Sequence, residues 1–334
     1  MKVVRTLPEA DWRSFVDQHP KGNIFHTPEM FRVFSYTNGY SPELWAAVDL
    51  DGEILALLLP IKITMLEGLL HRFTTRAVVY GSVLCAPRRQ GQEALAELLH
   101  AYNQETKGRL LFTELRNLSD MGALQPILNE QGFVYADHLN YLVDLNRSIS
   151  EIWKSIRPNA RRNIRRARKL GVRIEEVNDT SEITVIYSIL KRVYKRIRVP
   201  LPDLTLFQSA FEVLQPQGML RLFSAKVNDI EIGVLTLLIY KGVVTYWYTG
   251  TLREYTSYRA GDLLVWNTLE LGNQDGYHTF DFGGGGRPEE KYGVRDFKAK
   301  FGGCLVNFGR NTRVHAPIRL KLSQEGYGLI RRFL

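Results

Sequence analysis

Two segments of the chain resemble each other at a fixed offset of 178 residues, from Ala47 to Ala225. Each segment contains two short apolar runs around a tight polar turn, Asp51-Gly52 in the first and Asn228-Asp229 in the second, a pattern typical of a β-hairpin. A repeat of this kind predicts the same folding unit twice in one chain. Seven positions carry the same residue in both segments: Ala47/Ala225, Asp51/Asp229, Glu53/Glu231, Ile54/Ile232, Leu57/Leu235, Leu59/Leu237 and Ile61/Ile239.

The elements around the two hairpins follow the same order. An aromatic-rich helical segment precedes each hairpin (28–36 and 204–214), a helix follows (88–107 and 261–275), and a strand closes each half (109–115 and 278–282). At 334 residues the chain has the length of two ordinary domains. We therefore predict a mixed α/β (α+β) fold with one domain over residues 1–145 and a related one over 146–334, and we expect the turns at Asp51 and Asp229 to be equivalent.

The stretch from Arg157 to Arg173 holds eight basic residues and no acidic one. Its pattern predicts a helix over residues 158–170, with Pro158 in the first turn and Gly171 just after the end. So many like charges on one helix repel one another, which favours an anionic partner over a merely solvated basic face. The spacing places Ala160, Ile164 and Ala167 on a buried stripe and Arg161, Arg165 and Arg168 on another.

The net charge of the chain also favours an anionic partner. A formal charge of +9 and a pI near 9.4 favour nucleic acid, a nucleotide diphosphate or an anionic membrane surface as partner. The seven histidines form no metal-binding motif, so we expect neither a metal nor a bound cofactor. No apolar segment has the length of a signal peptide or a membrane span, which predicts a cytoplasmic protein able to make peripheral contact with the inner face of the membrane.

A run of four glycines, 283–286, follows the predicted strand that ends near Asp281. It matches neither a dinucleotide-binding nor a nucleotide-triphosphate loop, and it reads equally as a flexible loop. Residues 297–301 alternate as a strand, which would place Lys298 and Lys300 on one face, suited to an acyl oxygen or a phosphate. The alternative is a pair of lysines that protects a sheet edge from aggregation.

Several of these motifs together resemble the FemAB-like acyltransferases, which include the Fem aminoacyltransferases of peptidoglycan bridges and exopolysaccharide-associated relatives. The resemblance covers nearly the whole chain and implies two tandem GNAT-like acyl-CoA N-acyltransferase domains, in agreement with the repeat. It rests on residues 161–172 of the basic segment, on Tyr248-Thr-Gly250, on Phe280-Asp-Phe-Gly-Gly284, on Phe297-Lys-Ala-Lys-Phe-Gly302 and on Phe25-His-Thr-Pro-Glu-Met-Phe31.

The resemblance also implies roles for individual residues. Aminolysis of an ester or thioester needs a neutral amine, stabilisation of the oxyanion and protonation of the leaving group. The family's active-site lysine corresponds to Lys298, and Asp281 is the nearest polar orienting group, so these two are the catalytic candidates. The substrate-binding candidates are Arg161, Arg165, Arg192, Tyr194, Arg198, Tyr248, Gly283, Gly284 and Lys300.

Three functions remain open at this point. The favoured one transfers an aminoacyl group from aminoacyl-tRNA to an amine of a nucleotide- or lipid-linked precursor of peptidoglycan or another envelope polymer. The second uses acyl-CoA to acylate an amine in exopolysaccharide biosynthesis; the usual GNAT pyrophosphate loop has only a partial match, at 259–262, which favours the tRNA donor. The third is a non-catalytic binder of RNA or anionic lipid.

Overall fold

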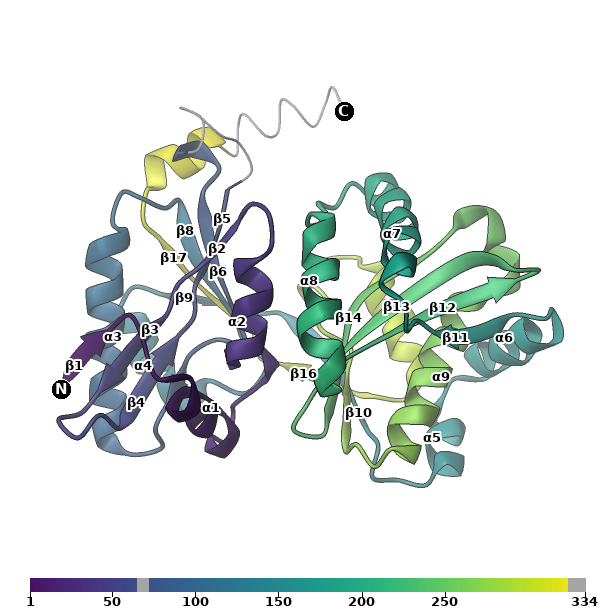
Figure 1. Ribbon diagram of the computed structural model, residues 1–334, viewed down its shortest axis with the longest axis horizontal. Coiled ribbons are helices and arrows are strands. Elements are labelled where there is room, and N and C mark those ends of the chain that lie inside the picture. Colours follow the sequence, from purple (N-terminus) through teal and green to yellow (C-terminus); the bar gives the residue numbers. More distant parts are fainter. Residues whose placement is uncertain (65–71, 324–334) are drawn as a thin grey trace. The chain divides into compact units, whose positions relative to one another are not determined.

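The structure is a computed structural model that describes residues 1–64 and 72–323 of the chain. The chain forms two compact units; in Figure 1 the first is drawn in purple to blue with its last segment in yellow, and the second in teal to yellow-green. Unit 1 contains residues 1–137 together with the segment that begins at Phe308, and unit 2 contains residues 138–307. In the described part of the chain, no helix is both long and apolar enough to cross a membrane.

These boundaries differ from the predicted division at 145/146. Strand β10 (Leu139–Asp144) pairs with β15 (Thr279–Asp281) and β16 (Cys304–Asn307), so it belongs to unit 2. Strand β17 (Arg310–Val314) pairs with β8 (Phe112–Arg116) and β9 (Val134–Ala136), so it belongs to unit 1. The last strand of each half of the sequence therefore lies in the sheet of the other half.

Unit 2 contains a seven-stranded sheet in the order β11-β12-β13-β14-β15-β10-β16, in which β14 and β15 run parallel. Helices α5, α6 and α9 share one core cluster with the sheet, while α7 packs on β13 and β14 and contacts α8. The further strands are β11 (Arg173–Glu176), β12 (Leu220–Val227), β13 (Ile230–Tyr240) and β14 (Val243–Thr251). The helices are α5 (Ile149–Ser155), α6 (Pro158–Lys169), α7 (Ile183–Ile197), α8 (Leu204–Leu214), α9 (Ala260–Gln274) and α10 (Gly293–Lys298).

Unit 1 contains two sheets, in the orders β1-β3-β4-β7 and β2-β5-β6-β8-β17-β9. Helix α3 packs on β3 and β4, and its apolar side chains fill the core of the unit. The further strands are β1 (Lys2–Val4), β2 (Tyr40–Pro42), β3 (Trp45–Val48), β4 (Ile54–Leu58), β5 (Ile61–Ile63), β6 (Arg76–Tyr80) and β7 (Leu84–Cys85). The helices are α1 (Glu9–Gln18), α2 (Pro28–Ser35), α3 (Arg89–Thr106) and α4 (Gln125–Glu130).

The two units share one topology, which confirms the predicted duplication. Read together, β4 and β5 of unit 1 correspond to the long strand β13, and β7 and β6 correspond to β14. Pro60 separates β4 from β5 because proline has no N–H for the ladder. The parallel pair β6–β8 matches β14–β15, and both hairpins carry a bulge at the same aligned place, after Ala47 and after Ala225.

Candidate active site

The segment that carries Lys298 is helical, so the predicted strand over residues 297–301 is wrong. Helix α10 ends at Lys298 and a 3₁₀ turn continues to Phe301, where Gly302 takes a positive φ of 77°. The rings of Phe297 and Phe301 pack edge to face, with 5.2 Å between their centres. Residues four positions apart share a face in a helix as well as in a strand, so five residues of sequence do not distinguish the two structures. Lys298 is buried in this helix, whereas Lys300 is only half-buried with its Nζ over the Phe297 ring.

The ammonium group of Lys298 holds the start of the glycine loop. It donates to the carbonyl oxygens of Phe282 at 2.5 Å and Gly284 at 2.7 Å, and its Nζ lies 5.3 Å from the centre of the Tyr246 ring. Burial lowers the pKa of Lys298 to about 8, and the nearby Asp281 opposes that shift. A lysine with this pKa is still mostly protonated at neutral pH and can serve as a hydrogen-bond donor to an oxyanion.

Asp281 and Asn140 form a buried polar pair on the neighbouring strands β15 and β10. Asn140 Nδ2 donates to Asp281 Oδ1 at 2.6 Å, and the same oxygen accepts the N–H of Gly283 at 2.7 Å. The N–H of Gly284 in turn donates to Asn140 Oδ1 at 2.8 Å. Burial raises the pKa of Asp281, while Asn140, Gly283 and Lys298 act against this rise. Asp281 therefore orients the loop, and the N–H groups of both predicted glycines are engaged inside the protein.

A second cation of α10 holds the rest of the loop. Arg295 Nη1 donates to the carbonyl oxygens of Gly285 at 3.4 Å and Arg287 at 2.5 Å. Its Nη2 donates to those of Pro288, at 3.3 Å, and Glu290. Sequence reasoning missed Arg295 because its partners are backbone atoms. Lys298 and Arg295 together fix the loop in one conformation.

The glycine loop begins where two parallel strands separate. Strands β14 and β15 pair only from Val243/Thr279 to Thr245/Asp281, and β14 then continues to Thr251 paired with β13 but not with β15. Ligands of α/β proteins bind at the carboxyl ends of such strands, where the sheet opens. Lys298 and Asp281 both lie at this opening, so the structure brings the two predicted catalytic residues to one place.

A bulge in β14 separates two tyrosines that stand two positions apart. Tyr246 pairs with Leu237 and Tyr248 with Thr236, which leaves Trp247 without a partner in the ladder. Tyr246 consequently joins the core cluster on the Lys298 side, whereas Tyr248 faces α7, 6.0 Å from the ring of Tyr194. Burial raises the pKa of Tyr194 to about 12. The structure thus brings the predicted pair Tyr194 and Tyr248 together, and it adds Tyr246, which the sequence reading missed.

The basic helix α6 has the predicted faces. Ala160, Ile164 and Ala167 are fully buried, and Gly171 closes the helix with a φ of 76°. Arg168 pairs with Glu270 at 3.2 Å and Arg173 with Asp229 at 2.7 Å. Within the described residues, no carboxylate lies within 4.0 Å of the four remaining arginines of the helix, and Arg165 stacks over Trp153. These four are Arg161, Arg162, Arg165 and Arg166.

Two predicted residues are exposed on α7 or at its end, and a third, Lys300, lies in the turn just after Lys298. Arg192 is exposed on α7 and pairs with Glu254 at 2.5 Å, and Arg198 is exposed at the left-handed residue that ends α7. Burial raises the pKa of the Asp262 carboxyl, and the positive charge of Lys300 acts against this rise. Asp262 lies in the first turn of α9 and accepts a hydrogen bond from Asn163 of α6 at 3.3 Å. Both residues lie in segments singled out in the sequence, 161–172 and 259–262, but neither was predicted as a site residue.

We expect the Gly283→Ala substitution to destabilise unit 2. Gly283 has a φ of 71°, and a Cβ there would lie 2.7 Å from the Tyr246 carbonyl oxygen. Gly276 is a matched control because its φ is 77° and a Cβ there would meet nothing within 4 Å. Gly276→Ala should lower the free energy of unfolding by about 1–2 kcal/mol, the cost of left-handed backbone in L-residues. In urea denaturation, Gly283→Ala should cost clearly more; an equal cost would mean that the backbone contact is not tight.

Residues 154–298 match the acetyltransferase (GNAT) domain family, a range that lies within unit 2 and ends at Lys298. Unit 2 is a GNAT-type acyltransferase domain. The match places α6, the strands β12 to β15, α9 and the glycine loop inside the GNAT domain. The comparison with curated proteins gives no match.

Solved structures show the same fold over nearly the whole chain, which confirms the predicted fold of two tandem GNAT-like domains. FemX shares 15% identity at a TM-score of 0.72, covering 97% of this chain and 100% of its own. A tandem GNAT protein from the clavulanic acid biosynthesis pathway shares 13% at 0.60, covering 95% and 99%. The C-terminal domain of a putative lysylphosphatidylglycerol synthetase from Agrobacterium fabrum shares 13% at 0.57, covering 96% of each. At these identities the likeness shows the fold.

Among residues 1–64 and 72–323, no three His, Cys, Asp or Glu side chains lie close enough together to hold a metal ion. Several hydrogen-bond donors and acceptors of the chain itself could act on a substrate. At the opening between β14 and β15 these are Lys298, Asp281, Asn140 and Tyr246.

Proposed function

We propose that this chain transfers an aminoacyl group from aminoacyl-tRNA to an amine of a peptidoglycan precursor or another cell-envelope precursor. The observation that carries the donor assignment is the set of four arginines on α6, Arg161, Arg162, Arg165 and Arg166, which have no carboxylate partner among the described residues. Phosphates of a nucleic acid backbone satisfy such a row of arginines. The name lysylphosphatidylglycerol synthetase describes a product with an aminoacyl group, which supports the same transfer on this fold.

The reaction needs little from the protein beyond placement and charge. The acceptor amine attacks the ester carbonyl carbon, the bond to the ribose oxygen breaks, and the proton of the amine ends on that oxygen. Lys298 donates a hydrogen bond to the carbonyl oxygen as its negative charge develops. Asp281 and Asn140 act as positioning residues, because they accept the N–H groups of Gly283 and Gly284 and so fix the loop whose carbonyl oxygens Lys298 binds. The amine attacks directly, so no covalent enzyme intermediate forms.

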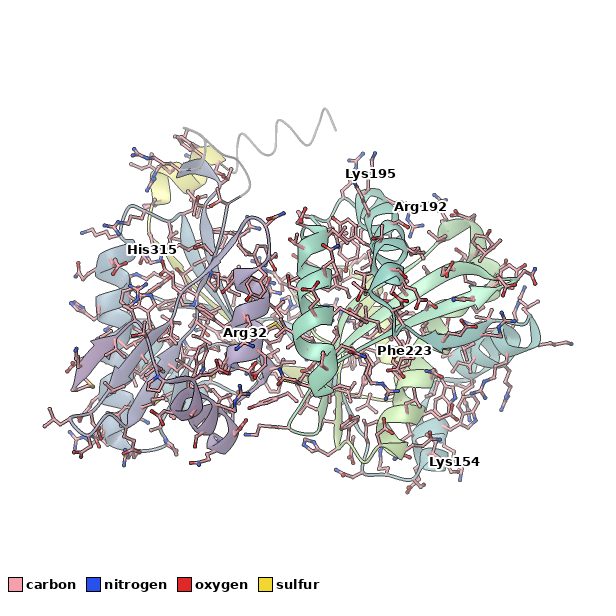
Figure 2. The ribbon with its side chains drawn as sticks, in the orientation of Figure 1. Arg32, Lys154, Arg192, Lys195, Phe223 and His315 are labelled. Atoms are coloured by element: carbon pink, nitrogen blue, oxygen red, sulfur yellow. The ribbon has the colours of Figure 1, made fainter. Side chains whose placement is uncertain are left out.

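The acceptor is nucleotide- or lipid-linked, and a second basic surface supports a lipid-linked one. The end of α7 and the residues after it carry five basic side chains, Lys191, Arg192, Lys195, Arg196 and Arg198. Two aliphatic side chains beside them are unusually exposed, Ile197 at 49% and Val199 at 47%. Figure 2 shows Arg192 and Lys195 extending outward from α7. Basic residues next to exposed aliphatic ones favour peripheral binding to an anionic membrane.

We expect this α7 surface to bind vesicles that contain phosphatidylglycerol. Each basic residue near an anionic surface contributes about 1 kcal/mol, so replacing Lys191 and Lys195 by Ser should weaken vesicle binding by ~30-fold. Sedimentation with vesicles of phosphatidylglycerol and phosphatidylcholine measures the effect. The matched control replaces Arg88 and Arg89 of unit 1 by Ser, which removes the same charge elsewhere. Equal binding by both double variants would refute the assignment of this surface.

A transfer assay decides between the donors. The protein is incubated with radiolabelled aminoacyl-tRNA or acetyl-CoA and with UDP-muramoyl pentapeptide, an amino sugar or a lipid-linked muropeptide, and amide products are separated by chromatography. We expect product with aminoacyl-tRNA and a muropeptide amine, and none from the Lys298→Met variant. Product formed with acetyl-CoA but not with aminoacyl-tRNA would establish acyl-CoA as the donor instead.

The alternative donor is supported by the start of α9. Arg259 stands there in a left-handed conformation, and its Nε is buried without a hydrogen-bond partner in the described structure. A pyrophosphate at this helix N-terminus would give that group a partner. An acyl-CoA-dependent N-acyltransferase of exopolysaccharide biosynthesis would use this site, and the acetyl-CoA arm of the assay tests it. A non-catalytic binder of RNA or anionic lipid would bind its ligand and give no product in either arm.

A further inference from the structure

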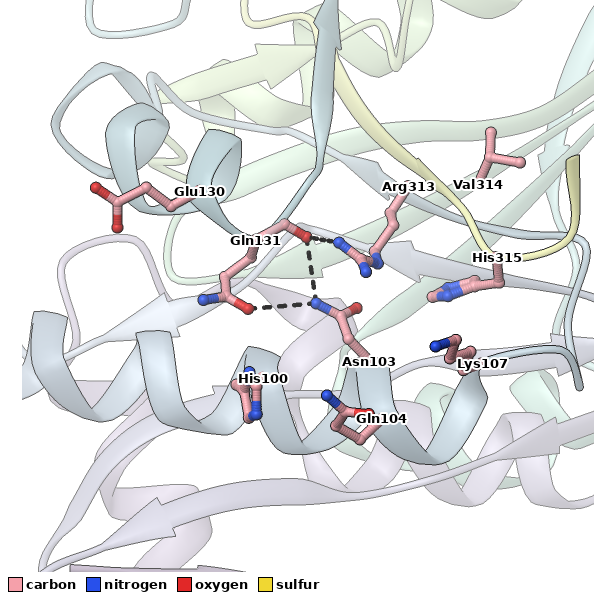
Figure 3. Close-up of a pocket in the computed structure, with 9 residues that line it drawn as sticks. All are labelled: His100, Asn103, Gln104, Lys107, Glu130, Gln131, Arg313, Val314 and His315. Carbon is pink, nitrogen blue, oxygen red and sulfur yellow. Dashed lines mark hydrogen bonds between the residues drawn. The ribbon is translucent and has the colours of Figure 1, made fainter.

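Unit 1 contains a polar cavity that the proposed transfer reaction does not use. It has a volume of about 430 Å³ and lies between α3, the end of α4 and the end of β17 (Figure 3). The end of β17 meets α3 and α4 here although Arg313 lies 182 positions after Gln131, and together the segments bring four potential cations and one carboxylate to the same space. The lining residues are His100, Asn103, Gln104, Lys107, Glu130, Gln131, Arg313, Val314 and His315.

Asn103 presents a buried hydrogen-bond acceptor to this cavity. The residue is only 6% exposed, and its Nδ2 donates to the carbonyl oxygen of Gln131 at 3.2 Å. The Gln131 carbonyl oxygen determines which way the Asn103 amide is turned, because the opposite orientation would place Asn103 Oδ1 next to that oxygen with no hydrogen between them. Oδ1 is therefore turned away from Gln131, as Figure 3 shows, and it has no hydrogen-bond partner among the described residues. A buried acceptor without a partner costs about 1–3 kcal/mol, so the cavity favours a molecule that donates to it.

Arg313 presents a donor to the same cavity. Its Nη1 donates to the Gln131 carbonyl oxygen, which anchors the guanidinium, while its Nε is buried and has no partner in the described structure. Lys107 adds a second positive charge at the exposed end of α3. Together they outweigh the single carboxylate of Glu130. The donor set therefore favours an acid group.

His315 stays neutral at the inner wall. Its Nε2 lies 2.8 Å from the hydroxyl of Thr113, which in turn is bonded to Tyr102 at 2.8 Å. Burial and the charge of Arg313 lower the pKa of His315 to about 4. His315 therefore contributes no charge at neutral pH, and the positive charges on which the proposal rests are those of Arg313 and Lys107.

We propose that this cavity is a binding site for a small molecule in which an acid group stands next to an O–H or N–H donor. The acid group would bind Arg313 and Lys107, and the donor would bind Asn103 Oδ1. Hydroxylated phosphate esters and free amino acids share this chemistry. The site lies in unit 1, whereas Lys298 lies in unit 2, and its ligand is not required by the proposed transfer reaction.

Isothermal titration calorimetry with four probes tests the proposal on the full chain. Glycerol 3-phosphate and L-serine combine an acid group with a donor, inorganic phosphate has the acid group with only its own O–H, and glycerol has donors alone. We expect saturable binding of at least one of the first two, weaker binding of phosphate by tenfold or more, and none of glycerol. Which of the first two binds distinguishes a phosphate ester from an amino acid.

Two substitutions connect binding to these side chains. Asn103→Leu keeps the shape and removes the acceptor, and Arg313→Met removes the charge. Each should weaken binding of the preferred probe by tenfold or more, the effect of losing one hydrogen bond to a charged group. Lys107→Met, at the exposed rim, provides a milder variant if either buried change prevents folding, and Arg89→Met at the other end of α3 should bind as the wild type does. The absence of saturable binding to all probes, or equal binding by every variant, would overturn the proposal.

Discussion

The Lys298→Met variant is expected to lose ~10²–10³ in kcat with little change in KM, the effect of removing one oxyanion donor. The ammonium of Lys298 reaches two loop carbonyls and the Tyr246 ring at the opening between β14 and β15. Steady-state kinetics of aminoacyl transfer measure the effect. Lys291→Met, which removes an exposed lysine just after the glycine loop, is the matched control and should keep both constants.

The pH dependence separates a catalytic ammonium from a purely structural one. If the protonated form is required, activity should fall above pH 8, where Lys298 loses its proton, and Lys298→Met should lack that limb in its residual activity. A rise in KM alone would assign Lys298 to substrate binding. An unchanged rate would leave it with only the loop contacts that the structure shows.

The same shift has a consequence for stability. The pKa of Lys298 is lower in the folded protein, about 8, than the ordinary 10.5, so between these values the unfolded chain binds more protons. The stability of the wild type should therefore rise by about 1–3 kcal/mol from pH 8 to 10.5 relative to Lys298→Met. Below pH 8 both states are protonated and the difference between the two proteins should be constant. Urea denaturation at several pH values checks this sign.

The arginines of α6 should produce the second large effect. If Arg161, Arg162, Arg165 and Arg166 each neutralise one phosphate of a tRNA, the logarithm of the binding constant should fall with the logarithm of salt concentration. The slope should be roughly −0.9 per phosphate on duplex and −0.7 on single strands. Replacing Arg162 and Arg166 by Ala should flatten it by about 1.4–1.8. The buried stripe of α6 is untouched, so the fold should survive.

The Arg88/Arg89 double variant serves as the control, since it removes two arginines that already pair with Glu53 and Glu93. Its slope should equal that of the wild type. A CoA donor offers fewer phosphates and should give a shallow slope in all proteins. A steep slope that survives substitution of all four α6 arginines would exclude this helix as the tRNA-binding surface.

Local patterns in the sequence were sufficient for much of the fold. The repeat at 178 residues predicted both hairpins, and the aligned bulges after Ala47 and Ala225 show how closely the two copies agree. The buried stripe of α6 followed from helical spacing alone, because Ala160, Ile164 and Ala167 are the apolar positions of an otherwise charged segment.

The remaining features depend on contacts that no local pattern records. Residues 297–301 alternate like a strand, yet the packing of Phe297 on Phe301 and the positive φ of Gly302 make them helical. The bulge at Trp247 puts Tyr246 and Tyr248 on opposite faces of the sheet, although two positions of a regular strand would share a face. Asn140 becomes a partner of Asp281 only because two strands 141 positions apart in sequence meet in the sheet.

The exchange of β10 and β17 sets the order in which the two units can be completed during synthesis. Unit 2 is continuous, and all its strands have left the ribosome once residue 307 has emerged. The sheet of unit 1 is incomplete until β17 has been synthesised, because β17 lies between β8 and β9. The edges of β8 and β9 that pair with β17 stay unpaired while the whole of unit 2 is made. Unit 1 comes first in the sequence but is thus the last to finish folding. A chain that ended at Asn307 would keep every strand of unit 2 and would lack β17 of unit 1.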